Sequence, residues 1–138
     1  MMHLRRVSGM RFIALFCWCL VVALPLQAQS TPKGAHIKFA QTEYNFGEVS
    51  RKGENRSCLF AFENDGTEPL VILAVTTTCS CLKIEYPRKP IAVGAKGEIR
   101  LLLESKKMEA GVFRRVVQVR STSVGGAEVL TIKGFSKD

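Results

Sequence analysis

The chain has 138 residues, 46% of them hydrophobic and 23% charged, and a formal net charge of +8 at neutral pH. This composition is typical of one ordinary globular domain and excludes a disordered or collagen-like chain. Basic and acidic residues are interspersed, with no aromatic residues grouped among the basic ones, so the charge does not predict nucleic-acid binding.

Residues 1–28 have the pattern of a secretory signal peptide. Three arginines precede the uncharged apolar run FIALFCWCLVVALPL, and a small residue, Ala28, ends the segment. The run is shorter than the roughly 20 residues that a membrane-spanning helix needs, and Pro25 interrupts it. An uncleaved anchor is the alternative. We expect cleavage after Ala28, no transmembrane span in the mature chain, and a secreted or periplasmic protein, with association at the cell surface left open.

The remaining chain is predicted to contain a flexible segment, residues 29–40, and a single domain, residues 41–138. Loss of the leader would remove three of the 20 basic residues and none of the 12 acidic ones, which lowers the net charge from +8 to +5. A charge of this size favours solubility and could favour anionic surfaces or glycans as partners.

Short alternating runs, rich in β-branched and aromatic residues, follow one another from residue 37 onward. The first extended region is IKFAQTEYNFGEV, and RSCLFAFEN, LVILAVTTT, CLKIEY, EIRLLLES, GVFRRVVQVRS and AEVLTIKGF follow in that order. Turn-forming residues separate the runs, and no long helical pattern lies between them. About seven strands in a chain of roughly 110 residues after the leader predict an all-β fold, an antiparallel β-sandwich of the immunoglobulin type.

Alternation along the later runs also predicts which side chains form the core. The inward set is Cys58, Phe60, Phe62, Ile99, Leu101, Leu103, Phe113, Val117, Val119, Leu130 and Ile132. Arg115 falls on the inward phase of its run, so either a bulge shifts the register there or that strand end is exposed.

Two local patterns lead to further predictions. LVILAVTTT is apolar on both faces, which predicts a strand that is central in its sheet or covered on both sides. The Asp65-Gly66 pair before it is suited to a turn with positive φ.

The succession YNFGEV, FAFENDGTEPLVI, TTCSCL, PIAVGAKGEIRLLL, GVFRRVVQVRS and a last strand ending in IKG resembles the secreted bacterial proteins of domain-of-unknown-function family 1573. That family is similar to the Ig-like group of ASH, major-sperm-protein and PapD-type domains. The resemblance covers residues 43–134 and implies the fold and an exported location, but no established activity. The family pattern usually has glycine between the paired cysteines and threonine after the second, where this chain has Ser80 and Leu82.

Three cysteines follow the leader, and Cys58, Cys79 and Cys81 are the thiol or disulfide candidates. Export exposes them to oxidising conditions, and their odd number leaves at least one without a partner inside the chain. The immunoglobulin bridge between the second and sixth strands is excluded because GVFRRVVQVRS has no cysteine. We interpret Cys58 as buried filler, with a bridge to Cys79 or Cys81 as the alternative.

Cys79 and Cys81 can bond to each other only if the chain turns between them. On a regular strand their Cα atoms would lie about 6.6 Å apart with parallel side chains, whereas disulfides prefer about 5.5–6 Å. The threonine run before Cys79 could supply a turn, and such a bridge would be strained and readily reduced. Unpaired structural thiols, a soft metal such as Cu(I) with Cys58 or Met108 as further donors, and redox exchange are the other hypotheses. No activating histidine or lysine stands beside the pair, since Lys83 lies two residues on.

No other chemistry is predicted. The one histidine after the leader, His36, falls in the flexible segment, so neither a catalytic triad nor a metal or cofactor site is expected. Tyr44, Phe46 and Tyr86 are interpreted as core or rim packing. We therefore predict an exported, non-enzymatic binding or structural module of the cell envelope. Its partner would be an envelope protein or glycan, recruited for example by strand addition at a sheet edge. The alternative is a thiol-based copper-binding or redox protein.

Overall fold

The computed structural model describes residue 30 and residues 33–138. The predicted signal peptide lies outside the described residues. The described chain contains, in order, β1 (Ile37–Phe39), β2 (Glu43–Ser50), β3 (Arg56–Asn64), β4 (Ile72–Thr77), β5 (Leu82–Glu85), β6 (Lys96–Leu103), the 3₁₀ turn η1 (Ser105–Lys107), β7 (Gly111–Ser121) and β8 (Glu128–Lys137).

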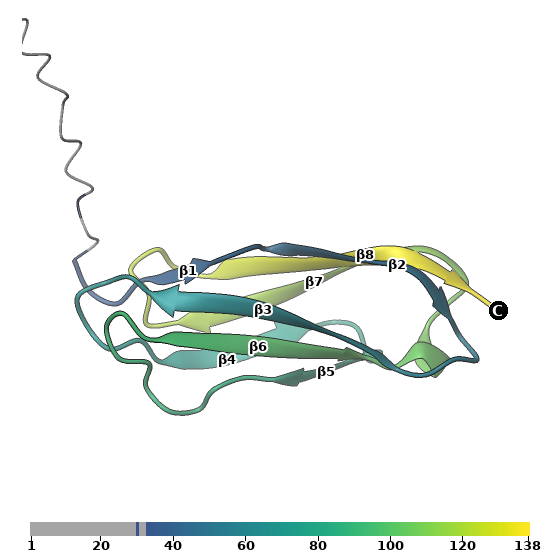
Figure 1. Cartoon of the computed structure of the whole chain (residues 1–138), viewed down its shortest axis with the longest axis horizontal. Coiled ribbons are helices and arrows are strands. Elements are labelled where there is room, and N and C mark those ends of the chain that lie inside the picture. Colours follow the sequence, from purple (N-terminus) through teal and green to yellow (C-terminus); the bar gives the residue numbers. More distant parts are fainter. Residues whose placement is uncertain (1–29, 31–32) are drawn as a thin grey trace, which may run out of the picture.

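The strands form two layers, which Figure 1 shows one in front of the other, with β3 and β6 in the nearer layer and β7 and β4 in the fainter, more distant one. One sheet has the order β1-β3-β6-β5 and the other the order β2-β8-β7-β4. The predicted all-β sandwich is therefore confirmed, with eight strands in place of about seven. The core is a single apolar layer between the sheets, and every residue of the predicted inward set is buried in it.

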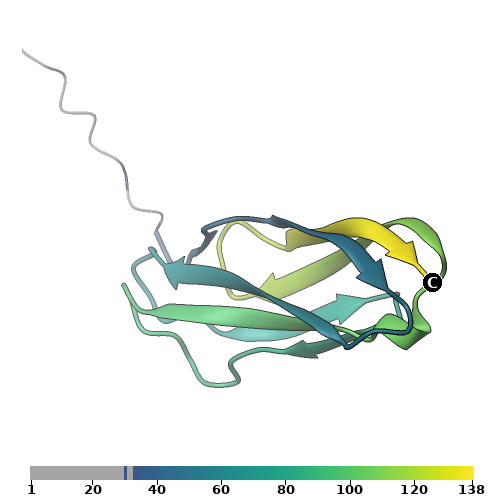
Figure 2. The ribbon, with the colours of Figure 1, turned by 45° about the vertical axis from the view of Figure 1, so that its right-hand side comes forward.

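One strand pair departs from the expected antiparallel pattern. β2 runs parallel to β8, whereas every other strand pair among the described residues is antiparallel. The reason is that the first extended region is divided between the two sheets. The chain pairs with β3 as β1, crosses to the other layer, and continues as β2, a path visible along the upper side of Figures 1 and 2.

β1 lies inside the segment 29–40 that the sequence predicted to be flexible, so the boundary at residue 41 needs correction. Ile37 is 2% exposed and pairs with Asn64, and its N–H donates to Ser123 Oγ at 3.2 Å. Ala35 is also buried. Ala35 and Ile37 are flanked by polar residues, and the predicted domain boundary therefore left these two buried apolar residues outside the domain.

β4 was predicted to be central or covered on both sides, and this prediction was wrong. It is an edge strand that pairs with β7 alone, and Leu73 is 55% exposed. The apolar side chain of Leu73 therefore remains at the surface.

Gly66 does not have the positive φ that the Asp65-Gly66 pair suggested. Instead, the chain passes too close for a side chain, because a Cβ on Gly66 would lie 2.2 Å from the carbonyl oxygen of Gly34. Glycine is needed here for close backbone approach.

Candidate functional site

A tight turn between β4 and β5 carries the paired cysteines. The Thr77 hydroxyl accepts the N–H of Cys79 at 3.3 Å and donates to the carbonyl of Val116 on β7 at 3.0 Å. The N–H of Leu82 donates to the carbonyl of Cys79 at 3.4 Å, which closes the turn. The threonine run thus performs the local backbone bonding that the sequence suggested.

Cys79 and Cys81 are joined by a disulfide, and the turn brings their Cα atoms to 5.2 Å. The N–H of Cys81 also points to Cys79 Sγ at 3.3 Å. The two halves of the bridge differ in exposure, because Cys81 is 2% exposed whereas Cys79 is partly exposed. Reagents in solution therefore meet Cys79 first.

Cys58 takes no part in this bridge. It is a free, buried cysteine on β3, opposite Leu101 of β6, and the alternative of a bond to Cys79 or Cys81 is not realised. Burial raises the pKa of its thiol to about 11, because the core disfavours the charged thiolate. Cys58 is thus an inert core residue at neutral pH.

The turn lines a hollow of about 440 Å³. In Figure 1 the turn between β4 and β5 lies toward the end of the sandwich that carries η1 and the C-terminus. Its lining includes Thr78, both bonded cysteines, Lys107, Arg114 and Arg115. Glu109 is the one acidic residue in this lining. The disulfide therefore lies in a positively charged environment.

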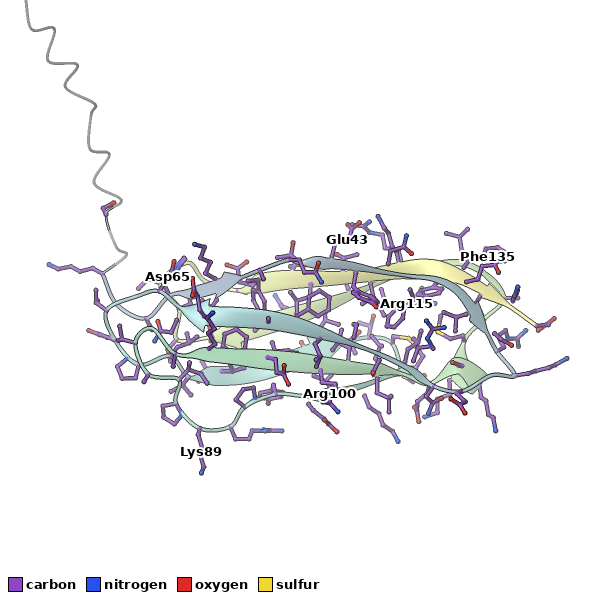
Figure 3. All side chains as sticks on the ribbon, viewed as in Figure 1. Glu43, Asp65, Lys89, Arg100, Arg115 and Phe135 are labelled. Atoms are coloured by element: carbon purple, nitrogen blue, oxygen red, sulfur yellow. A yellow bond between two sulfur atoms is a disulfide. The ribbon has the colours of Figure 1, made fainter. Side chains whose placement is uncertain are left out.

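The three cations of the hollow differ in how far their charge is already neutralised. Lys107 Nζ lies 2.6 Å from Glu104 Oε2, and Arg114 Nη1 lies 3.7 Å from Glu43 Oε2. Arg115, labelled in Figure 3, has no carboxylate within 4.0 Å in the described part of the chain. Its Nη1 donates to the carbonyl of Arg114 at 3.2 Å, so the guanidinium is hydrogen-bonded but its charge is not neutralised by an ion pair.

Sequence reasoning missed these cations, although one signal was present. Arg115 pairs with Ile132 without a register shift, so it keeps the inward phase of β7. β4 pairs with β7 only as far as Val117, so Arg115 lies where the sheet has lost its edge strand. Of the two explanations offered for Arg115, the exposed strand end is therefore correct.

Such a site has the components of thiol–disulfide exchange: a partly exposed cysteine that lines an open hollow, a bonded partner sulfur, and cations that favour thiolates. No group of three or more His, Cys, Asp or Glu residues that could hold a metal ion occurs in the described part of the chain. Met108, a suggested copper donor, is buried.

The remaining predicted residues lie elsewhere. His36 pairs with Asp65, a residue at the opposite end of the sandwich in Figure 3. Tyr44 packs edge-to-face on buried Phe46 at 4.9 Å between ring centroids, and Arg88 lies 4.2 Å from the centre of the Tyr86 ring. These aromatic residues are used in packing, as expected.

A second candidate surface is the free edge of β4, whose sequence ILAVTT has neither charge nor proline. The other sheet edges are protected. β1 has three residues, β5 has four and carries Lys83 and Glu85, and β2 is interrupted by a bulge between Asn45 and Glu48. Short, charged or bulged edges discourage strand pairing, which leaves β4 as the edge most open to a further strand.

The family model described as "Protein of unknown function (DUF1573)" matches residues 37–136. The chain belongs to this family. The resemblance that the strand succession suggested is thus confirmed, and the family match begins at β1, within the segment predicted to be flexible. No curated protein matches the chain.

Several solved structures have a fold similar to that of this chain. A protein of unknown function from Porphyromonas gingivalis W83 has a TM-score of 0.66 at 18% identity, over 76% of this chain and 48% of that one. The chain thus spans about half of that protein. The seventh ASH/PapD-like domain of human CEP192 has a TM-score of 0.59 at 12% identity, over 85% and 96%. The Vibrio cholerae VesB protease has a TM-score of 0.56 at 11% identity, over 75% and 32%. At such identities the likeness shows the fold alone.

No helix in the described residues is long and apolar enough to cross a membrane.

Proposed function

We propose that this protein is an exported, non-enzymatic binding module of the cell envelope that recruits an extended segment of a partner protein at the edge of β4. The observation that carries the proposal is an uncharged edge strand of six residues with Leu73 exposed. An added strand would use the backbone groups of β4 for affinity and the side chains at alternate positions for specificity.

Alternation of the side chains along β4 supports the same surface. Val75 is buried in the core, whereas Thr76 is exposed and opposes Gln118 on β7. An incoming strand would lie about 4.8 Å from β4 and about twice as far from β7. A partner bound at the edge would therefore contact Thr76 much more closely than Gln118.

The test is site-specific photocrosslinking in cells that export the protein. A photoreactive residue at Thr76 is expected to form one defined adduct, and the same residue at Gln118, the matched control on the same face, is not. Adding Leu73→Lys should abolish the adduct at Thr76, because charge on an edge strand resists pairing. Equal adducts at both positions, or none at Thr76, would remove the basis of the proposal.

A second candidate function is a thiol-based role of the Cys79–Cys81 pair. It is favoured by the position of the disulfide in an open, cationic hollow. A structural bridge would more commonly be enclosed and would close a long loop.

Thiol counting in the folded protein tests this second candidate. Mature protein purified without reductant is expected to show no reactive thiol until it is unfolded, when Cys58 alone reacts. A mild reductant should then free Cys79 and Cys81 while the far-ultraviolet circular dichroism remains that of a β-protein. A disulfide that opens only when the fold is lost would exclude the thiol-based role.

A further inference from the structure

We propose that the hollow beside the disulfide is a docking site for an acidic dithiol, a peptide or protein segment with two cysteines flanked by carboxylates, which exchanges electrons with the bridge through Cys79. The inference rests on the second candidate function and specifies its partner. Two separate observations carry it: the unequal exposure of the two cysteines, and the guanidinium of Arg115, which has no carboxylate within 4.0 Å in the described part of the chain.

The direction of attack follows from exposure. Both cysteines line the hollow, but Cys79 is partly exposed, whereas Cys81 is almost fully buried and its carbonyl accepts the N–H of Glu104 at 2.8 Å. An incoming thiolate approaches along the axis of the S–S bond and needs an accessible sulfur. Cys79 Sγ is that sulfur, and Cys81 Sγ is the leaving group.

The exchange balances with a dithiol as the only co-reactant. One partner thiolate forms a bond to Cys79 Sγ, the bond between the two protein sulfurs breaks, and Cys81 leaves as a thiolate. The second partner thiolate then attacks the partner sulfur of the mixed disulfide and releases Cys79 as a thiolate. The protein gains two electrons and becomes a dithiol, the partner is oxidised to a disulfide, and the partner's two thiol protons go to the protein's thiols through solvent.

The charge of the hollow selects an acidic partner. Lys107 and Arg114 already face Glu104 and Glu43, so a bound carboxylate would gain most from Arg115. Partly enclosed cations of one sign raise the local concentration of oppositely charged ligands and their association rate. They also favour the thiolate form of both the attacking and the leaving sulfur.

The small size of the loop that the disulfide closes also favours a role in exchange. Cys79 and Cys81 are separated by only two positions, so the bridge restricts very little of the unfolded chain. A bond that contributes little to folding, and that is open to solvent among cations, is better suited to exchange than to holding the fold together.

The experiment measures how fast synthetic dithiol peptides open the bridge in the folded protein. Three peptides of equal length and equal cysteine spacing are compared, with the cysteines flanked by Asp, Ser or Lys. Rates are followed by acid quenching, alkylation and mass spectrometry, and are divided by the thiolate fraction of each peptide. At low salt the Asp-flanked peptide is expected to react roughly tenfold faster than the Lys-flanked one, and high salt should reduce this ratio.

Matched variants identify the residue responsible. Arg115→Gln should lower the Asp-to-Lys rate ratio severalfold. Arg120→Gln, an exposed arginine on the same strand but outside the hollow, should leave it unchanged. Two single variants compare the cysteines directly: Cys81→Ser keeps Cys79, and Cys79→Ser keeps Cys81. Cys79 should form a mixed disulfide with an activated Asp-flanked peptide faster than Cys81 does.

The possible outcomes distinguish the preference for an acidic partner from the thiol-based role on which it rests. Bridge opening at equal, salt-independent rates for all three peptides would overturn the acidic partner and leave the thiol-based role standing. Faster trapping at Cys81 would overturn the proposed direction of attack. Failure of every peptide to open the bridge in the folded protein would overturn the thiol-based role itself.

Discussion

Asn64 is the residue whose side chain holds one end of the sandwich together. It is fully buried, and its Oδ1 accepts the N–H groups of His36 and Gly66 at 3.3 and 3.1 Å. Its Nδ2 donates to the carbonyls of Glu68 and Ile91 at 2.7 and 3.0 Å. One side chain therefore satisfies backbone groups of three loops that are far apart in the sequence.

Asn64→Ala is expected to lower the free energy of unfolding by roughly 2–4 kcal/mol, because it leaves the N–H groups of His36 and Gly66 without their acceptor inside the protein. Urea unfolding measures this loss. Asn45→Ala is the matched control, since Asn45 Oδ1 also accepts an N–H two residues on, from Gly47 at 2.8 Å, but at an exposed position. Equal losses in the two variants would contradict the role given to Asn64.

The lowered pKa of the Glu104 carboxyl predicts part of the pH dependence of the free energy of unfolding. The ion pair of Glu104 with Lys107 at 2.6 Å, with Lys83 at 3.2 Å as a further contributor, lowers the pKa of this carboxyl below the ordinary value of 4.5. A lowered pKa means that the folded state favours the carboxylate. The resulting stabilisation is complete above about pH 4.5 and is lost as the pH falls through the lower, folded-state pKa.

Glu104→Gln should therefore make the free energy of unfolding fall less steeply as the pH is lowered, as measured by urea unfolding between pH 7 and pH 3. Glu98→Gln, an exposed carboxylate on β6 without an ion pair in the described chain, serves as the control and should change the profile less. A profile for Glu104→Gln that matches wild type would show that this ion pair contributes nothing.

At the scale of elements, β1 decides where the domain begins. If residues 29–40 were a flexible lead, changes there would be neutral. The structure instead buries Ile37 against the core and pairs β1 with β3. The sequence indicated an extended run from residue 37, but the three residues of β1 were too few to move the predicted start of the domain before residue 41.

Ile37→Ala is expected to lower the free energy of unfolding by roughly 2–4 kcal/mol, because it opens a cavity in the core. Lys38→Ala, at the neighbouring exposed position, should change it by less than about 0.5 kcal/mol. Thermal or urea unfolding of both variants checks the difference. A neutral Ile37→Ala would restore the boundary at residue 41.

β4 shows what a strand's own sequence cannot reveal. An apolar, uncharged run is what a central strand needs, but the neighbours of a strand are chosen by the whole topology. Here the sheet order places β7, with its 11 residues, inside and β4 at the edge. The same sequence feature that suggested burial becomes, at an edge, the surface proposed for binding a partner.

At the scale of the whole molecule, global stability comes from the core between the sheets and not from the disulfide. A bridge that closes a three-residue loop restricts the unfolded chain by only about 1.6 kcal/mol, against about 3 kcal/mol for a 15-residue loop. The double variant Cys79→Ser/Cys81→Ser should therefore remain folded and lose about 1–2 kcal/mol. Denaturant unfolding of oxidised wild type and the double variant measures this. A loss above about 4 kcal/mol would mean that the bridge is a structural staple.

The sequence by itself determined the fold class and the core. Alternation assigned the inward residues from Cys58 to Ile132 correctly, because a strand has only two faces and one of them must be buried. The strand succession likewise indicated the family. These properties depend on neighbours along the chain.

Only the tertiary structure decided which edges are free, where the domain starts, and what surrounds the disulfide. Lys107, Arg114 and Arg115 follow the cysteines by more than 20 positions and lie near them because η1 and the start of β7 line the same hollow as the β4–β5 turn. The electrostatics of a site depends on distances in space, and those distances are set by how two sheets close on one core.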